Sequence, residues 1–428
     1  MKISIVGSGY VGLSTGIGFA RKGNHVICFD IEKETVEKIN RKEPTFYEPH
    51  VEDALKDAVS KGLLKATGDL DYAIRNSDIT FICVPTPSKK DGGIDASYIR
   101  EAAAALGKAL KKRGYHVFVV KSTALPGTTE NVALPELQKY SGKKCGGDFG
   151  LCMNPEFLRE GSALEDFLKP DRIVIGEFDK KSGDFLETLY MGFGSPIVRT
   201  DIKTAEMIKY VSNAFLAAKI SFSNEMGNIC KKIGIDVYDV MNAVGLDKRI
   251  SPHFLDAGIG FGGSCFSKDV SALISKAKTV AETPAVMESV LETNKKQPLR
   301  IIELLKRRIN IKGKTVCVLG LAFKARTDDI REAPSVKIAE YLLKEGVKVN
   351  AYDPEAIERF RQKYPQIRYF GSAREALRNS DACLILTEWD EFRGLDESDF
   401  SLMRDKIIIE GRKVLDRKKV KGFEGVCW

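Results

Sequence analysis

The sequence predicts an α/β protein with two doubly wound parallel-sheet domains, joined by a long central helix and a helical middle domain. Short apolar segments typical of buried strands alternate with amphipathic helical segments over residues 1–200. A continuous helical pattern follows over residues 201–232, and a second alternating region at 310–428 repeats features of the first. We therefore expect three parts, at 1–200, 201–309 and 310–428, which suits a chain of 428 residues.

The overall composition is that of a soluble globular protein. Hydrophobic residues make up 43% of the chain and charged residues 29%, so the chain has enough apolar side chains for a sizeable core. The formal net charge of +8 suits an anionic ligand, but the chain contains no block of five or six like charges and no nucleic-acid motif. We therefore expect no nucleic-acid partner.

The nine cysteines indicate a reducing compartment. Their number is odd and no C-x-x-C spacing occurs, so neither a disulfide framework nor a metal site is indicated. Cys83, Cys152, Cys317 and Cys383 lie in apolar, strand-like runs and are expected to fill the core. Because the chain shows no signal-peptide pattern and no apolar run of membrane-spanning length, we expect a cytoplasmic protein without a membrane partner.

The first strand, turn and helix carry a dinucleotide-binding pattern. A buried strand at 3–6 leads into Gly7-Ser8-Gly9-Tyr10-Val11-Gly12, a helix over 13–22 and a strand over 25–30 that ends in Asp30. Such glycines allow a tight turn and a close approach of the pyrophosphate, whose charge the helix N-terminus attracts. This full context, which a lone G-x-G-x-x-G lacks, predicts a Rossmann-like domain that binds a dinucleotide.

The acid after the second strand indicates which dinucleotide binds. Asp30 stands where a carboxylate would bind the adenosine ribose, and it would repel a 2′-phosphate. The pattern therefore favours NAD over NADP, although the nearby Lys33 keeps the alternative open.

Polar side chains follow further strands of the first domain. Because ligands of open parallel sheets lie at the carboxyl ends of the strands, Thr86, Thr123, Glu156 and Glu160 should converge toward the nicotinamide. A turn-forming or capping role is the alternative for each residue taken alone. The expected elements of this region are strands at 79–84, 117–121, 151–153 and 172–176, and a helix at 99–112.

The long helix at 201–232 carries a possible oxyanion site. Asp201 or the residue before it can cap the helix, and Gly234 follows its end. Lys209 and Asn213 are four residues apart, on one face, where an ammonium and an amide could stabilise a developing negative charge. The alternative is a surface lysine and an ordinary helix-interior asparagine. A helix this long is also the expected dimer contact.

The stretch Gly260-Phe261-Gly262-Gly263-Ser264-Cys265-Phe266-Ser267-Lys268-Asp269 is the candidate catalytic loop. Glycines open the backbone to a ligand, and cations beside Cys265 would favour its thiolate. The alternative is an inert, half-buried cysteine in a permissive loop. Helical patterns follow at 270–279 and 285–309.

The last third repeats the first. In this copy the glycine motif is broken, because Gly9 corresponds to Ala322, so a second dinucleotide is not expected. Another nucleotide or a sugar nucleotide, held partly by Lys324, Arg331 and Arg412, is the functional interpretation, and a duplicated packing domain is the alternative. The matching segments are 315–323 with 3–10, 347–353 with 25–30, and 376–383 with 73–80.

Taken together, the motifs resemble those of the UDP-glucose/GDP-mannose dehydrogenase family over essentially the whole chain. The resemblance implies an NAD domain, a helical dimerisation domain and a C-terminal UDP-binding domain, assembled as a homodimer. The motifs are GSGYVG (7–12), FICVPTP (81–87), KSTALPGT (121–128), NPEFLREGSA (154–163), the helix with Lys209 and Asn213, GFGGSCFSKD (260–269) and LGLAFKARTDDIREAPS (319–335).

The resemblance implies a twofold oxidation of a primary alcohol to an acid. An aldehyde formed in the first oxidation is captured by a cysteine as a thiohemiacetal, oxidised to a thioester and released by water. The implied roles are Cys265 as nucleophile, Lys209 and Asn213 at the oxyanion, Glu160 with Thr123 and Asp269 for protons and the hydrolytic water, and Glu156 as an alternative base.

The resemblance also implies two sets of binding residues and no metal. Arg249 matches an arginine that the family can offer across the dimer interface. The implied cofactor residues are Gly7, Gly9, Tyr10, Val11, Gly12, Asp30, Lys33, Pro85, Thr86, Thr123, Glu160, Lys268 and Arg331. The implied substrate residues are Glu156, Phe157, Leu158, Lys209, Asn213, Arg249, Phe254, Gly262, Lys324 and Arg412.

Two positions in the cysteine loop bear on rigidity and substrate. Ser267 stands where the family commonly has proline, which loosens the turn but leaves Cys265 in register. Ser264 replaces a histidine common in relatives that act on N-acetylated hexosamines, so it favours glucose or mannose, and residues 387–392 resemble the UDP-glucose branch. UDP-glucose is therefore the expected substrate. The alternatives are GDP-mannose, a UDP-N-acetylhexosamine, or a non-catalytic protein that binds NAD and a nucleotide.

Overall fold

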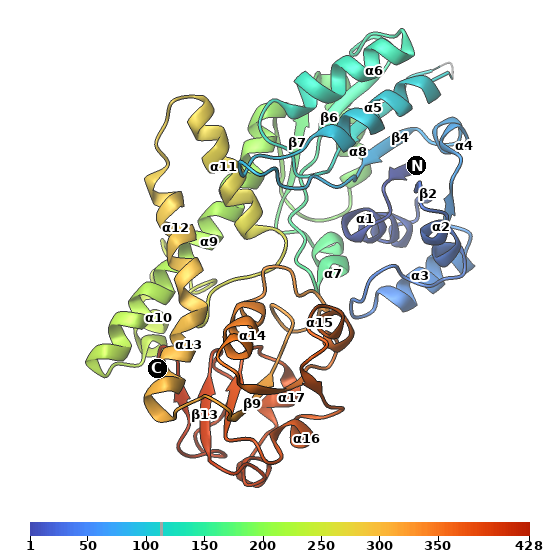
Figure 1. Ribbon diagram of the computed structural model, residues 1–428. Helices are drawn as coiled ribbons and strands as arrows, with labels where there is room; N and C mark the ends of the chain where they lie inside the picture. The colour runs from blue at the N-terminus through green and yellow to red at the C-terminus, as the bar shows by residue number, and fades with distance from the viewer. Residues whose placement is uncertain (112–113) are drawn as a thin grey trace. The chain divides into compact units, whose positions relative to one another are not determined.

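The computed structural model describes residues 1–111 and 114–428, which form two compact units, Met1–Ser212 and Asn213–Trp428. Each unit contains one sheet of mostly parallel strands with helices connecting them (Figure 1). The expected α/β architecture with two Rossmann-like sheets and a helical middle region is confirmed.

The first unit is built on an eight-stranded sheet in the order β3-β2-β1-β4-β5-β6-β7-β8. Its first six positions have the strand order of a dinucleotide-binding domain. Strand residues alternate between two apolar clusters, with Val119 in one and Phe118 in the other, so helices must cover both faces. The strands are β1 (Lys2–Val6), β2 (His25–Phe29), β3 (Leu64–Thr67), β4 (Ile79–Ile82), β5 (Val117–Val120), β6 (Gly150–Met153), β7 (Ile173–Glu177) and β8 (Ile197–Asp201).

The sheet departs from an all-parallel arrangement at one place. β7 runs antiparallel to β6, with Met153 opposite Gly176, and β8 runs parallel to β7. The connection contains only one short helix of six residues, so the chain does not cross back over the sheet after β6. The loop that carries Glu156 and Glu160 therefore lies along the carboxyl edge of the sheet.

The helices of this unit confirm most of the sequence pattern. The first helix begins at Tyr10, directly after Gly9, rather than at the expected residue 13. Residue 112, where the expected helix at 99–112 ends, lies outside the described residues. The helices are α1 (Tyr10–Arg21), α2 (Lys33–Asn40), α3 (Val51–Ser60), α4 (Leu70–Arg75), α5 (Ser97–Ala109), the π-helical η1 (Thr129–Ala133), α6 (Leu134–Ser141), α7 (Ala163–Leu168) and α8 (Lys180–Tyr190).

The long central helix is α9 (Ile202–Ile233), one uninterrupted element in Figure 1. The Asp201 carboxylate accepts the Thr204 N–H at 2.9 Å and so caps the first turn. Gly234 follows the last turn with φ of +78°, a conformation that glycine adopts without strain. The expected helix and its end signals are thus confirmed. No helix within the described part of the chain is long and apolar enough to cross a membrane.

The second unit contains a six-stranded parallel sheet in the order β11-β10-β9-β12-β13-β14. In chain order this is the same arrangement as the first six strands of the other unit, so the predicted repeat is confirmed. The strands are β9 (Thr315–Leu319), β10 (Lys348–Tyr352), β11 (Arg368–Tyr369), β12 (Ala382–Ile385), β13 (Ile407–Glu410) and β14 (Glu424–Gly425).

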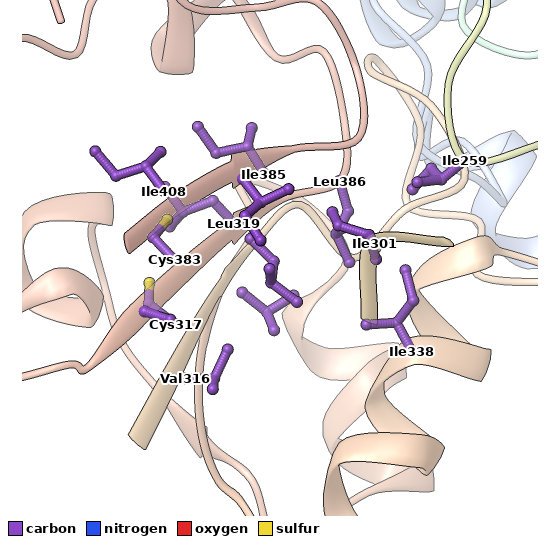
Figure 2. Close-up of a cluster of buried hydrophobic side chains, with 14 of the residues drawn as sticks. Ile259, Ile301, Val316, Cys317, Leu319, Ile338, Cys383, Ile385, Leu386 and Ile408 are labelled. Atoms are coloured by element: carbon purple, nitrogen blue, oxygen red, sulfur yellow. The ribbon is translucent and has the colours of Figure 1, made fainter. Parts of the chain in front are cut away.

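The core of the second sheet includes two of the expected core cysteines. Cys317 of β9 and Cys383 of β12 are opposite each other in the register and fully buried. Figure 2 shows them in one apolar cluster with Ile408 of β13, Ile301 and Ile338. Cys83 and Cys152 are buried in the first unit, and the structure contains no disulfide among the described residues.

One expected helix is divided. The pattern at 285–309 forms two α-helices separated by a short 3₁₀ turn that contains Pro298. Proline lacks an N–H and clashes with the preceding turn, so a continuous α-helix through this position was the wrong prediction. The helices of this unit are α10 (Val237–Gly245), α11 (Phe266–Thr279), α12 (Ala285–Lys296), the 3₁₀ helix η2 (Gln297–Leu299), α13 (Arg300–Arg308), α14 (Pro334–Lys344), α15 (Ile357–Lys363), α16 (Ala373–Leu377), α17 (Asp390–Arg393) and α18 (Glu397–Phe400).

Candidate active site

The glycine turn between β1 and α1 forms a cradle that larger residues would fill. A Cβ atom on Gly12 would lie 1.9 Å from the carbonyl oxygen of Gly7, and one on Gly7 would lie 2.8 Å from that of Cys83. Asp30 follows β2 and accepts the Ser8 N–H at 2.7 Å, so its carboxylate lies beside the turn. Lys33 pairs with Glu37 at 3.6 Å. The turn, the acid and the helix N-terminus together fit an NAD-binding site.

In the second unit, the backbone of the corresponding turn is hydrogen-bonded to the acid Asp353. The Oδ2 of Asp353 accepts N–H groups from Leu321 at 2.7 Å, Ala322 at 3.1 Å and the Trp389 indole at 3.0 Å. Asp353 is fully buried, so its carboxylate is used within the domain and not offered to a ribose. This arrangement supports the interpretation that the second sheet does not bind a dinucleotide in the same way.

A buried ion pair lies after β6. The Lys209 Nζ of α9 is 2.9 Å from Glu156 Oε1, and their side chains are only 4% and 7% exposed. The other Glu156 oxygen accepts the Leu158 N–H at 2.6 Å. Burial raises the pKa of Glu156, but the Lys209 ion pair, the Leu158 N–H and the charge of Lys121 outweigh it, so the net pKa lies below its usual value. Glu156 is therefore a carboxylate at neutral pH.

A second buried cation lies beside this pair. Lys121 follows β5 and donates to Asn154 Oδ1 at 3.0 Å. Burial lowers the pKa of Lys121 to about 8, against the opposing effects of Cys83 and Glu156, and nearby Lys209 lowers it further. The sequence reasoning did not assign Lys121 a role. The available signal was a lysine at the end of an otherwise apolar strand.

The loop that carries Thr123 is anchored by α9. Glu206, whose side chain is fully buried, accepts the Gly127 N–H at 2.5 Å and the Thr129 N–H at 2.8 Å. Thr123 is half-buried near the start of this loop. Sequence reasoning missed Glu206, because a glutamate on a helix carries no local sign that it is buried.

Glu206 should make stability depend on pH. Burial raises its pKa to about 7 in the folded protein, against an ordinary value of 4.5. Between these two pH values, the folded protein keeps a proton that the unfolded chain has released. The free energy of unfolding therefore falls as the pH rises, by roughly 3 kcal/mol in all. We expect the melting temperature to fall from about pH 5 to about pH 7. Glu206→Gln should flatten this slope, and an unchanged slope would contradict the assignment.

Cys265 occupies the N-cap of α11. Its carbonyl oxygen accepts the Asp269 N–H at 2.8 Å, and its side chain is exposed. The Ser264 hydroxyl lies 3.5 Å from the Cys265 sulfur. A helix N-terminus favours a negative charge placed on it, so this position suits a reactive thiolate. The expected helix at 270–279 in fact begins at Phe266 and so reaches the cysteine.

A buried carboxylate one turn further along α11 orients Asn213. Asp269 is 1% exposed, and its Oδ2 accepts the Asn213 amide N–H at 2.6 Å. Lys268 Nζ lies 3.6 Å from the other oxygen of Asp269. The second unit thus brings Asn213 to the helix that begins at Cys265, although these residues are far apart in sequence. An amide held in this way is a preorganised polar group.

The glycines before Cys265 press against the loop that follows β9. A Cβ atom on Gly262 would lie 2.5 Å from the Glu332 carbonyl oxygen, and one on Gly263 would lie 2.8 Å from the Phe323 ring. The Gly263 N–H donates to the Arg331 carbonyl oxygen at 2.8 Å. These contacts pack the cysteine loop closely against the loop that follows β9.

Gly263→Ala should destabilise the protein and lower its activity. Gly263 has φ of +83°, which costs an L-residue ~1–2 kcal/mol, and the contact with Phe323 should add ~1–3 kcal/mol. Gly313→Ala is the matched control, because Gly313 has φ of +73° with no atom within 4 Å of the added carbon. Denaturant unfolding should show the larger loss for Gly263→Ala, and equal losses would contradict the close packing.

Two arginines predicted at the binding sites are held by contacts within the second unit. Arg412 donates to the Gly260 carbonyl oxygen at 2.5 Å and pairs with Glu388 at 3.6 Å, so it touches the cysteine loop. Arg331 forms a fork with Asp329, its Nε lying 2.9 Å from both carboxylate oxygens.

Three further predicted residues differ in how they are packed. The Phe254 ring packs edge-on against Phe266, with centroids 6.4 Å apart, and half-buried Lys324 follows Phe323. The Arg249 side chain is 89% exposed and pairs with Asp247.

Comparison with known proteins places the chain in a family. Three domain models of the UDP-glucose/GDP-mannose dehydrogenase family match in order: the NAD binding domain at 1–194, the central domain at 203–296 and the UDP binding domain at 317–417. The chain belongs to this family of NAD-dependent nucleotide-sugar dehydrogenases.

Individual relatives match over nearly their full lengths. The UDP-glucose 6-dehydrogenase of Haloferax volcanii is 42% identical and covers 100% of both chains. That of Bacillus subtilis is also 42% identical, covering 98% of this chain and 91% of its own. The solved UDP-glucose dehydrogenase of Pyrobaculum islandicum is 41% identical, with a TM-score of 0.94 over 100% of this chain and 98% of its own.

A relative with a different substrate name shares the family fold. The structure of the UDP-D-ManNAc dehydrogenase of Pyrococcus horikoshii is 32% identical, with a TM-score of 0.87 over 100% of this chain and 99% of its own. The family fold therefore accommodates more than one sugar, and the fold alone does not select between them.

Proposed function

We propose that the protein oxidises UDP-glucose to UDP-glucuronate in two NAD-dependent steps through a covalent intermediate on Cys265. The observation that carries this proposal is the exposed Cys265 at the N-terminus of α11, in a loop held by Gly262 and Gly263 and followed by the buried Asp269. Relatives named UDP-glucose 6-dehydrogenase at 42% identity support the choice of sugar.

The chemistry needs both a hydride acceptor and a thiol. NAD, when bound by the glycine turn and Asp30, supplies hydride acceptance. The first oxidation turns the primary alcohol into an aldehyde, and the Cys265 sulfur adds to its carbonyl carbon as the oxygen takes up a proton. The second oxidation removes a hydride from the same carbon and a proton from the oxygen, which leaves a thioester. Water then cleaves the carbon–sulfur bond, releasing the acid and restoring the thiol.

The polar residues take distinct roles in this scheme. We assign Lys209 and the Asn213 amide to the developing negative charge on the substrate oxygen, because both groups are buried and held by carboxylates. Of the three candidate acids, Glu160 is half-buried, while Glu156 and Asp269 are buried. We therefore assign activation of the hydrolytic water to Glu160, assisted by Thr123.

The remaining predicted residues complete the proposed binding sites. The cofactor set is Gly7, Gly9, Tyr10, Val11, Gly12, Asp30, Lys33, Pro85, Thr86, Thr123, Glu160, Lys268 and Arg331. The substrate set is Glu156, Phe157, Leu158, Lys209, Asn213, Arg249, Phe254, Gly262, Lys324 and Arg412. We propose the functional boundaries 1–200, 201–309 and 310–428, which the matched ranges of the family models support. A reducing, cytoplasmic location would keep Cys265 as a thiol.

A substrate panel tests the function. The purified protein is given NAD with UDP-glucose, GDP-mannose or a UDP-N-acetylhexosamine, and NADH formation is followed by absorbance. We expect two NADH for each UDP-glucose consumed and little NADH with the other sugars. Turnover of another sugar alone would transfer the proposal to that sugar. Binding of NAD without NADH from any of them would favour a non-catalytic binding protein.

We propose that the protein acts as a homodimer through α9. Phe215, Phe222, Ile229 and Ile233 are 66%, 54%, 49% and 65% exposed, and their spacing places them along one side of the helix. Exposed apolar residues in such a row are typical of an interface. The row supports the dimer contact expected for this helix.

Phe222→Glu should weaken this dimer. A charge in the centre of an apolar interface is costly to desolvate, so light scattering should show a shift toward the 47.4 kDa monomer. Lys232→Glu changes an exposed polar residue on the same helix and should leave the mass unchanged. A Phe222→Glu protein with the same mass as the parent would contradict the proposed interface.

A further inference from the structure

Glu48 is a buried carboxylate that none of the motifs includes. It lies between α2 and α3 and is 5% exposed. Two segments donate hydrogen bonds to it: the glycine turn through the Tyr10 hydroxyl, and the 161–164 segment through the Gly161 N–H at 3.1 Å and the Leu164 N–H at 3.0 Å. Burying an ionisable group is costly unless it is well paired, and here both carboxylate oxygens are used.

These contacts join the glycine turn to the loop that carries Glu160. Tyr10 belongs to the G-x-G-x-x-G turn, and its ring packs against Phe46, with centroids 4.6 Å apart. The Tyr10 hydroxyl oxygen lies 3.2 Å from the Arg159 carbonyl oxygen and 3.1 Å from the Gly161 nitrogen. The peptide N–H that follows Glu160 is therefore held by the Tyr10–Glu48 pair, and the carbonyl that precedes Glu160 lies beside the Tyr10 hydroxyl.

The electrostatics keep the Tyr10 hydroxyl protonated. Burial raises the pKa of the Tyr10 phenol far above its ordinary value, and the Glu48 hydrogen bond and the charges of Glu48 and Glu160 raise it further. The phenol therefore stays protonated at working pH and remains a donor to Glu48. Tyr10 is thus not a catalytic base here, but a fixed link between two segments.

We propose that Glu48 is a positioning residue that fixes the backbone of Glu160 relative to the dinucleotide turn. The proposal rests on the proposed function, in which Glu160 activates the water that cleaves the Cys265 thioester. Glu48 touches neither substrate nor cofactor in this scheme. Its effect on the reaction passes through the N–H groups of Gly161 and Leu164.

Glu48→Gln is the test variant. Glutamine keeps the size of the side chain but replaces one acceptor oxygen with an amide NH2 group. That group is a donor and would face the donors of Tyr10 or of the 161–164 segment, so at least one hydrogen bond would be lost. Misplacing a catalytic group by a fraction of an ångström should lower kcat by about 10- to 100-fold. Because thioester hydrolysis is the affected step, the fraction of protein carrying a covalent adduct at Cys265 should rise.

The readout is the intact mass of the enzyme, quenched during turnover of UDP-glucose with NAD. We expect adduct accumulation in Glu48→Gln and in Glu160→Gln, and the double variant should be no slower than Glu160→Gln alone. Glu43→Gln, in the same loop but 55% exposed and paired with Arg41, should behave as the parent. If Glu48→Gln fails to fold, Tyr10→Phe becomes the test variant. It removes one of the three hydrogen-bond donors to Glu48 and keeps the other two, so the same adduct should accumulate to a smaller extent.

Two results would overturn the proposal. One is an adduct fraction in Glu48→Gln or folded Tyr10→Phe equal to that of the parent. The other is a double variant whose rate is the product of two independent losses. Failure of the proposed function would look different, because the parent enzyme itself would then form no NADH from UDP-glucose and no adduct.

Discussion

Replacing Cys265 with serine should reduce formation of the sugar acid by at least about a thousandfold, because an alcohol is a far weaker nucleophile than a thiolate at neutral pH. The serine hydroxyl would keep the N-terminal position on α11, so the fold and NAD binding should persist. The aldehyde of the first oxidation would no longer be captured. The amount of sugar acid, measured by chromatography, should be compared with the amount of NADH formed. We expect the acid to be lost.

Cys145→Ser is the matched control for this variant. Cys145 is half-buried in the first unit and has no role in the proposed chemistry, so the substitution should leave the rate of acid formation unchanged. Acid formation by Cys265→Ser at the parent rate would rule out the covalent step. It would leave family membership and NAD binding intact.

Replacing Lys209 with alanine should affect both stability and catalysis. The substitution leaves the Glu156 carboxylate buried without its partner at 2.9 Å, which typically costs ~3–5 kcal/mol. Loss of a cation near the developing oxyanion should lower kcat by ~100- to 1,000-fold. Thermal unfolding and NADH formation measure the two effects separately.

Two further variants separate these effects. Glu156→Gln combined with Lys209→Ala removes the unpaired charge, so it should recover much of the stability without recovering activity. Lys203→Ala on the same helix breaks a pair with Glu130 at 3.4 Å whose side chains are 59% and 32% exposed, and should cost at most ~1 kcal/mol. A double variant as unstable as Lys209→Ala would show that the cost is not the buried charge.

The sequence indicated those features that depend on neighbouring residues. The glycine turn, the end signals of α9 at Asp201 and Gly234, and the two alternating regions all appear in the structure as expected. Each depends on local backbone geometry or on a short apolar period, which a single segment contains in full. The cysteine loop was a candidate from its own sequence, but the position of Cys265 at the N-terminus of α11 was not predicted.

The tertiary structure alone decided which charges are buried and what they hold. Glu48 and Glu206 resemble ordinary surface residues in sequence, yet each is buried and bonded to segments distant in the chain. The antiparallel turn from β6 to β7 likewise depends on the path of the whole connection. A periodic pattern in the sequence indicates which face of a helix or strand is apolar. A buried polar contact needs two partners, and only the folded chain brings them together.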